Sequence, residues 1–180
     1  MKNNIALIGF MGAGKTVTGL ALATELAMNF IDLDTVIEKK TGKSISDIFA
    51  EQGEPVFREI EMEALREACN NQCSVIACGG GVVLKKENIT VINKSAVVVY
   101  LWAENATLLQ RIRDSRGKRP LLDVKDPASA IEEMVKARIT YYEKTADITI
   151  DTTGLTVNSI VRQIKSELGH DESFNIQKQH

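Results

Sequence analysis

Short apolar runs rich in β-branched residues alternate along the chain with longer segments whose apolar positions recur at helical spacing. Such runs are typical of buried strands, and their alternation with helix-length segments is typical of a parallel sheet covered by helices on both faces. The pattern therefore predicts an α/β fold. Five strands are expected, at residues 5–9, 30–33, 74–78, 96–101 and 148–150.

Helices are expected between these strands and after the last one. Ser44 and Asp47 suit a capping box that opens a short helix, and Pro55, soon after Gly53, suits the first turn of a new helix. Gly169 stands where the last helix should end. The other helices are expected at residues 17–27, 35–40 and 89–92, from Asn105 onward, from Asp126 and Pro127 onward, and at 157–168.

Length and composition favour a single domain. With 180 residues, 44% of them hydrophobic, the chain is long enough for one sizeable core and too short for two, so we expect one domain over residues 1–169. Residues 170–180 are polar and unpatterned, which predicts a disordered tail. Because the net charge is only −2, neither nucleic acid nor an anionic membrane is expected as a partner.

The cysteines and histidines limit the kinds of metal and catalytic site that the chain can form. Cys69, Cys73 and Cys78 are odd in number and lack the pair spacing of a zinc site, so we expect reduced thiols in a cytoplasmic protein. His170 and His180 lie near the end of the sequence, which leaves no histidine base or histidine metal site in the body of the chain. The first apolar run is too short for a signal peptide or a membrane span.

Residues 9–16 read GFMGAGKT and stand between the first strand and the first helix. This is the G-x-x-x-x-G-K-T phosphate-loop pattern in its expected context. Its glycines let backbone N–H groups point at a phosphate, and the positive end of the next helix dipole adds to the attraction. Lys15 would reach the β- and γ-phosphates and Thr16 would ligate Mg²⁺. The alternative is a glycine-rich turn in which Lys15 is merely solvated.

Two aspartates follow the second strand. Asp32 and Asp34 are two residues apart, so in an extended segment their side chains share one face. Ligands bind at the carboxyl ends of parallel strands, where one carboxylate near Mg²⁺ and one near a phosphoryl acceptor would suit phosphoryl transfer. The alternative is that the two aspartates only cap the next helix.

An arginine–glutamate pair and a glycine run follow. Arg58 and Glu61 share a helix face, so Glu61 could orient the guanidinium, although a surface ion pair of little energetic value is an equal alternative. Gly79, Gly80 and Gly81 come directly after the third strand. They form either a tight turn or a close backbone approach to a ligand.

Five basic side chains crowd residues 111–119, with Asp114 as the only acid among them. A solvated charged surface is the usual interpretation, and a mobile cationic lid over a triphosphate is another. A nucleic-acid patch is disfavoured because the net charge is negative and aromatic residues are not interleaved. The five are Arg111, Arg113, Arg116, Lys118 and Arg119.

Together these motifs resemble shikimate kinases along nearly the whole chain, from about Ile5 to Leu168. The resemblance implies a small P-loop kinase of the nucleoside monophosphate kinase type, with a five-stranded parallel sheet, a substrate subdomain at about 34–61 and a lid at about 114–125. It implies a monomer that phosphorylates the shikimate 3-hydroxyl with ATP, on the route to chorismate and the aromatic amino acids. It rests on GFMGAGKT at 9–16, Asp32-Leu33-Asp34, GEPVFR at 53–58 with Glu61, Gly79-Gly80-Gly81, RPLL at 119–122, and Arg138 with Tyr142.

The resemblance also implies residue roles. Lys15, Asp34 and Arg119 would be catalytic, with Asp34 binding the hydroxyl that is phosphorylated and serving as the candidate base. Thr16 and Asp32 would hold Mg²⁺. The substrate would be bound by Asp34, by Arg58 and Arg138 on its carboxylate, and by Gly79, Gly80 and Gly81. ATP would be bound by Gly12, Ala13, Gly14, Lys15, Thr16, Val17, Arg111, Arg119 and Thr153, with Arg111 and the loop at 151–153 on either side of the adenine.

Two other functions share part of this pattern. Gluconate kinase acts on another hydroxylated acid with the same fold, and a nucleotide-dependent switch or binding protein would share the phosphate loop. Two arginines favour an acidic substrate over a neutral sugar, because the guanidinium fork matches a carboxylate.

Overall fold

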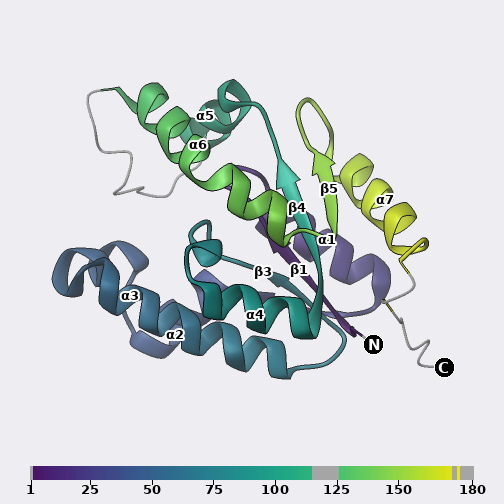
Figure 1. The fold of residues 1–180 in the computed structure, drawn as a ribbon, viewed down its shortest axis with the longest axis horizontal. Helices are drawn as coiled ribbons and strands as arrows, with labels where there is room; N and C mark the ends of the chain where they lie inside the picture. The colour runs from purple at the N-terminus through teal and green to yellow at the C-terminus, as the bar shows by residue number, and fades with distance from the viewer. Residues whose placement is uncertain (1, 115–125, 172–173, 175–180) are drawn as a thin grey trace.

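A five-stranded parallel sheet forms the centre of the computed structural model, which describes residues 2–114, 126–171 and 174. Every neighbouring pair of strands is parallel, so the carboxyl ends of all five strands lie at one edge (Figure 1). The predicted α/β fold and its five strands are confirmed, with bounds that differ by a residue at some ends. The strands are β1 (Asn4–Ile8), β2 (Asn29–Asp32), β3 (Ser74–Ala77), β4 (Ala96–Trp102) and β5 (Ile148–Asp151), in the spatial order β2-β3-β1-β4-β5.

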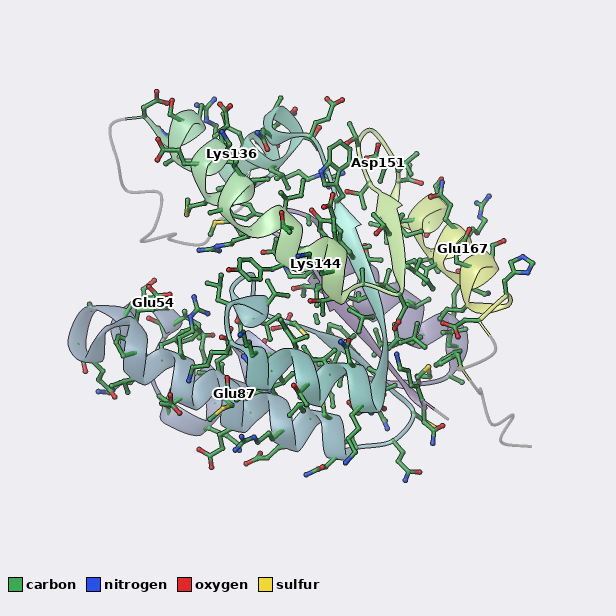
Figure 2. The ribbon with its side chains drawn as sticks, viewed as in Figure 1. Glu54, Glu87, Lys136, Lys144, Asp151 and Glu167 are labelled. Atoms are coloured by element: carbon green, nitrogen blue, oxygen red, sulfur yellow. The ribbon has the colours of Figure 1, made fainter. Side chains whose placement is uncertain are left out.

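Helices connect the strands and cover both faces of the sheet (Figure 1). Exposed charged side chains, among them Glu87, Lys136 and Glu167, lie on the outer faces of these helices (Figure 2). The helices are α1 (Lys15–Leu26), α2 (Leu33–Thr41), α3 (Ile45–Asn70), α4 (Lys86–Ser95), α5 (Asn105–Asp114), α6 (Pro127–Thr145) and α7 (Val157–Leu168), with a 3-10 turn, η1 (Val82–Leu84), before α4. Among the described helices, none combines the length and the apolar character that crossing a bilayer requires.

The alternation of side chains along β1 divides the core into two clusters. Ile5 and Leu7 pack on one face with side chains of α1 and α7, whereas Ala6 and Ile8 pack on the other with side chains of α2, α3 and α4. All four are fully buried. Because a strand covered on both faces has no solvent side, its sequence shows an unbroken apolar run.

One helix is longer than the sequence predicts, and another is divided where the sequence predicts a restart. α4 runs over Lys86–Ser95, well beyond the predicted 89–92. The prediction was too short because the end turns of this helix are polar and carry no periodic signal. α3 consists of two helical segments joined at Gly53, which has φ 79° and ψ 169°. The predicted restart of the chain at Gly53 and Pro55 is therefore confirmed, and it sets the direction of the segment that carries Arg58.

The predicted tail begins after α7. Of residues 170–180 the structure describes His170, Asp171 and Phe174, and the others lie outside the described residues. Phe174 pairs with Lys2 and packs against the core cluster that contains Ile5. Phe174 therefore contacts the core, and the disorder of the tail stays a prediction.

Candidate active site

The phosphate loop connects β1 to α1, as its sequence pattern predicts. Gly9, Gly12 and Gly14 have φ values of 142°, 81° and 91°, which other residues rarely adopt. Gly14 is the N-cap of α1 and offers no side-chain acceptor to the first N–H groups of the helix. These N–H groups and the helix dipole therefore favour an anion in the loop.

Lys15 and Thr16 begin α1 and make the contacts that organise the loop. Lys15 Nζ donates hydrogen bonds to the carbonyl oxygens of Gly9 at 2.9 Å and Phe10 at 3.0 Å. Its charge therefore stays beside the loop, and the solvated-lysine alternative is wrong. Thr16 Oγ1 donates to Asp32 Oδ2 at 2.7 Å, so the two predicted metal ligands lie together.

Asp32 and Asp34 do not lie on one extended segment, which corrects the geometry predicted for them. β2 ends at Asp32 and α2 begins at Leu33, so Asp34 lies in the first turn of a helix. The helix starts early because Asp32 Oδ1 accepts the N–H of Thr35 at 3.2 Å and caps it. Asp32 thus both caps α2 and contacts Thr16, so capping is one of two contacts that it makes.

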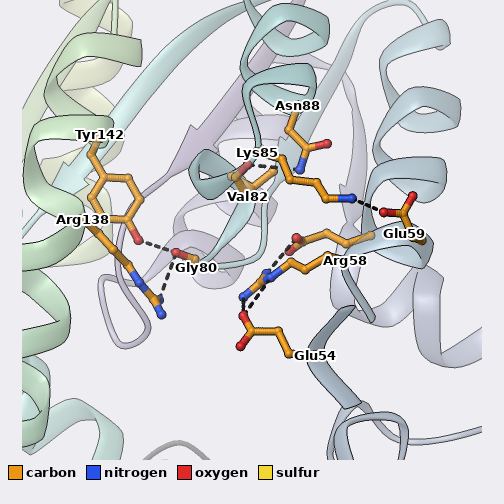
Figure 3. A network of polar contacts seen from close by, with 10 residues as sticks. Glu54, Arg58, Glu59, Gly80, Val82, Lys85, Asn88, Arg138 and Tyr142 are labelled. Atoms are coloured by element: carbon orange, nitrogen blue, oxygen red, sulfur yellow. Dashed lines mark hydrogen bonds and ion pairs between the residues drawn. The ribbon is translucent and has the colours of Figure 1, made fainter. Parts of the chain in front are cut away.

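Arg58, in the second segment of α3, is held by two carboxylates (Figure 3). Its Nη1 donates to Glu61 Oε2 at 2.8 Å, while Nε and Nη2 donate to Glu54 Oε1 at 3.1 and 2.8 Å. Arg58 is 8% exposed and Glu61 1% exposed, which excludes a loose surface ion pair. Burial lowers the pKa of Arg58, but the charges and hydrogen bonds of Glu61 and Glu54 outweigh burial and raise it overall. The guanidinium is therefore fixed and fully charged.

Glu61 depends on Arg58 in turn. Burial raises the pKa of the Glu61 carboxyl, and the nearby Asp34 and Glu54 charges add to this effect, whereas Arg58 opposes it. Its Oε1 accepts no hydrogen bond from any described residue. Removal of Arg58 would leave the Glu61 carboxylate buried and unpaired, which costs much free energy. The two side chains therefore position each other.

Each glycine of the 79–81 run packs against a different neighbour, and Gly79 and Gly81 leave no room for a side chain. A Cβ on Gly79 would lie 2.6 Å from Glu61 Oε1 and 3.4 Å from an Asp34 oxygen. A Cβ on Gly80 would lie 3.4 Å from the backbone N of Met11, in the phosphate loop. The run is therefore more than a tight turn, since it packs between the Arg58–Glu61 pair and the phosphate loop.

Gly81 offers a specific test of this packing. A Cβ there would lie 2.3 Å from both terminal nitrogens of Arg58, while its φ of −104° suits alanine. Gly81→Ala should therefore fold and displace the guanidinium. For the substrate and ATP sites predicted from the sequence, the expected result is a KM for the substrate about tenfold higher, with a smaller change in the KM for ATP. Gly169→Ala, after α7, is the control and should change neither KM. Unchanged steady-state constants in Gly81→Ala would contradict the proposed contact with Arg58.

Arg138 and Tyr142, one turn apart on α6, meet the same glycine run from the other side (Figure 3). Arg138 Nη1 donates to Gly80 O at 3.5 Å, and its guanidinium lies 5.7 Å from the centre of the Phe10 ring. The hydroxyl of Tyr142 donates to the same carbonyl. Burial raises the pKa of Tyr142 to about 12, so this hydroxyl keeps its proton. Arg138 therefore meets the glycine run at Gly80 and Arg58 meets it at Gly81, from two sides of the run (Figure 3).

Arg111 connects the phosphate loop to the loop that follows β5. Its Nη2 donates to Thr152 O at 2.7 Å, and its Nη1 donates to Thr152 Oγ1 at 3.0 Å and Gly12 O at 3.5 Å. Thr153 follows directly, and its Oγ1 accepts the N–H of Glu104 at 3.0 Å. Val17, on α1, is 56% exposed and contributes an accessible apolar side chain. Arg119 and residues 115–125 of the predicted lid lie outside the described residues.

Comparison with known proteins decides the family. The sequence model of shikimate kinases matches residues 11–169. A shikimate kinase from Thermodesulfovibrio yellowstonii is 44% identical over 164 residues, which cover 91% of this chain and 94% of that protein. The chain belongs to the shikimate kinase family. Its structure is also similar to that of a shikimate kinase from Acinetobacter baumannii in complex with shikimate, with 35% identity, a TM-score of 0.90 and 96% of both chains covered.

Membership of the shikimate kinase family confirms the sequence-based resemblance and the P-loop kinase fold. A gluconokinase from Sinorhizobium meliloti is also similar, with a TM-score of 0.56, but its identity of 16% shows a shared fold only. The gluconate kinase alternative therefore has less support than the shikimate kinase assignment.

Three contacts of this site were not predicted as contacts from the sequence. Glu54 binds Arg58 at i,i+4 spacing, a signal that was present in the sequence. Phe10 supplies a ring beneath Arg138, and Thr152 accepts from Arg111. Neither could be found from spacing, because each contact joins segments far apart in the chain.

Proposed function

We propose that this member of the shikimate kinase family transfers the γ-phosphoryl group of ATP to the 3-hydroxyl of shikimate. The observation that carries the proposal is that Arg138 and Arg58 meet the glycine run at Gly80 and Gly81, and that the backbone of Gly80 packs on the phosphate loop. Two guanidinium groups suit a carboxylate, and the loop suits a triphosphate. A small hydroxylated acid held by this pair would lie next to the phosphoryl donor. We further propose that the enzyme acts as a cytoplasmic monomer.

The proposal includes Mg²⁺, which Thr16 and Asp32 would hold. A hydroxyl and a carboxylate 2.7 Å apart offer only oxygen donors, which is the ligand type that Mg²⁺ prefers. Bound there, the ion would offset the negative charge of the β- and γ-phosphates. Lys15 and the N-terminus of α1 would stabilise the same charge, with Gly12, Ala13 and Gly14 supplying the loop around it.

Asp34 is the residue proposed to bind the acceptor hydroxyl. It is partly buried in the first turn of α2, and one of its oxygens faces Gly79. A carboxylate in that place can accept the hydroxyl proton as the new bond to phosphorus forms. Arg111, Val17 and Thr153 are proposed to contact the nucleoside, and Arg119 stays a sequence-based prediction for the lid.

The arginine clamp makes a prediction of its own. Arg58→Lys and Arg138→Lys keep the charge but lose the bidentate fork, so each should weaken shikimate binding about 10- to 100-fold while ATP binding changes little. Calorimetric titration of each ligand measures both effects. Arg66→Lys, an exposed substitution on the same helix as Arg58, is the matched control and should bind as the wild type does. Unchanged shikimate affinity in both clamp variants would remove these arginines from the substrate site.

A coupled assay for ADP release tests the function itself. Shikimate-dependent turnover is expected, with far lower rates when gluconate or no acceptor is added. Turnover that depends on gluconate would support the sugar-acid kinase alternative instead. Slow hydrolysis of ATP regardless of the acceptor would support a nucleotide-dependent switch.

A further inference from the structure

Glu54 gives Arg58 a second carboxylate beyond the one that orients it. Glu61 is 1% exposed, contacts Nη1 and has Gly79 packed against it, so it is a fixed partner. The side chain of Glu54 is 49% exposed, and its Oε1 takes the hydrogen bonds of both Nε and Nη2. Glu54 is therefore the partner of Arg58 on the solvent side.

The edge of Arg58 that Glu54 occupies is one that a substrate carboxylate would use. Nε and Nη2 present two parallel N–H donors, which is the arrangement that a carboxylate accepts most favourably. The charges of Asp34 and Glu54 already raise the pKa of the Glu61 carboxyl next to Arg58, so a carboxylate bound beside Glu54 would add to this repulsion. Substrate binding at this edge therefore requires that Glu54 move away.

Moving Glu54 away from Arg58 should cost little free energy. It directly follows Gly53, the non-helical residue that divides α3, so it lies at the start of the second helical segment. A helix start stabilises a negative charge without help from Arg58, and water can replace the lost contact because the side chain is half exposed. Glu61 has neither advantage, since it is buried in the middle of that segment.

We propose that Glu54 is a placeholder for the substrate carboxylate: it occupies the Nε–Nη2 edge of Arg58 until the carboxylate of shikimate displaces it. This inference rests on the proposed function and adds to it a residue that sets substrate affinity and selectivity. Without substrate, the placeholder keeps Arg58 oriented and neutralised. The cost is a weaker apparent affinity, because the ligand must compete with Glu54. A ligand without a carboxylate cannot replace the charge of Glu54, so the placeholder also favours acids.

The test compares Glu54→Gln with the wild type in steady-state kinetics and shikimate titrations. Removing the competing charge should lower the KM and Kd for shikimate about two- to fivefold, the range expected for a half-exposed ion pair, while kcat changes less and the KM for ATP stays constant. Glu54→Ala, which removes the hydrogen-bond acceptor, should also lower the KM and the Kd for shikimate. Glu59→Gln is the matched control, because the neighbouring, exposed Glu59 binds Lys85 instead (Figure 3).

The outcomes separate this proposal from the function on which it rests. A higher KM for shikimate in both Glu54 variants would show that Glu54 only aligns Arg58, and it would overturn the placeholder. Unchanged KM and Kd in both variants, with normal wild-type turnover, would overturn it as well. Wild-type protein without shikimate-dependent turnover would instead contradict the proposed function.

Discussion

Lys15→Met should lose nearly all turnover, with kcat reduced about 10²- to 10³-fold or more, and should keep the native fold. Lys15 lies at the start of α1, where its ammonium group is held over the loop by the carbonyl oxygens of Gly9 and Phe10. When ATP binds, Lys15 would exchange these carbonyl contacts for contacts with charged phosphate oxygens. Because phosphoryl transfer depends on positioning and charge stabilisation, no other group in the loop can replace this cation.

The measurement is the rate of ADP release at saturating ATP and shikimate, with circular dichroism as the check on folding. Lys39→Met is a suitable control, because Lys39 is exposed in α2 and its loss should leave the rate unchanged. A near-wild-type rate in Lys15→Met with an unaltered spectrum would mean that the phosphate-loop assignment is wrong.

Asp34→Asn should show the second large effect, a fall in kcat of about 10²- to 10⁴-fold that exceeds any loss of ATP binding. The amide keeps the shape of the side chain but cannot accept a proton as a carboxylate does. Asp34 is placed for this role by the early start of α2, which turns the side chain toward Gly79. Single-turnover rates and ATP titrations measure the two effects separately.

Asp32→Asn is the matched comparison for Asp34→Asn. Asp32 accepts from Thr16 and is proposed to serve the metal, so its loss should appear mainly as a higher Mg²⁺ requirement. Magnesium titrations that give the same profile for both variants would contradict the division of labour between the two aspartates.

The two halves of the site are joined by direct contacts. Phe10 belongs to the phosphate loop, yet its ring lies beneath the Arg138 guanidinium and its carbonyl binds Lys15. Gly80 packs on the same loop and accepts from both Arg138 and Tyr142. The proposed carboxylate clamp is therefore joined to the phosphate loop through Phe10 and Gly80, which would keep the acceptor close to the donor.

Much of this arrangement follows from local sequence patterns. The strands are predictable because each is an apolar run bounded by turn residues, and the phosphate loop is predictable because its glycines need positive φ values. Asp34 was placed on the wrong element, since a two-residue spacing does not reveal that Asp32 would cap a helix at once. Helix ends are decided by single side-chain contacts of this kind.

Contacts between distant segments are the part that the sequence could not supply. Arg111 meets Thr152 across 41 positions, and Arg138 meets Gly80 across 58. Each of these residues belongs to a motif or loop that the sequence analysis names, but nothing in the local pattern pairs Arg111 with Thr152 or Arg138 with Gly80. The need for glycine at 81 likewise becomes visible only when Arg58 is seen beside it.

Identification of the reaction product tests the central claim most directly. After incubation with ATP, Mg²⁺ and shikimate, phosphorus and proton NMR should show ADP and a single new phosphate monoester, with the phosphate on the 3-hydroxyl of shikimate. That outcome requires the clamp, Asp34 and the phosphate loop to orient one hydroxyl toward the γ-phosphoryl group. Inorganic phosphate without an ester, or an ester at another hydroxyl, would contradict the account.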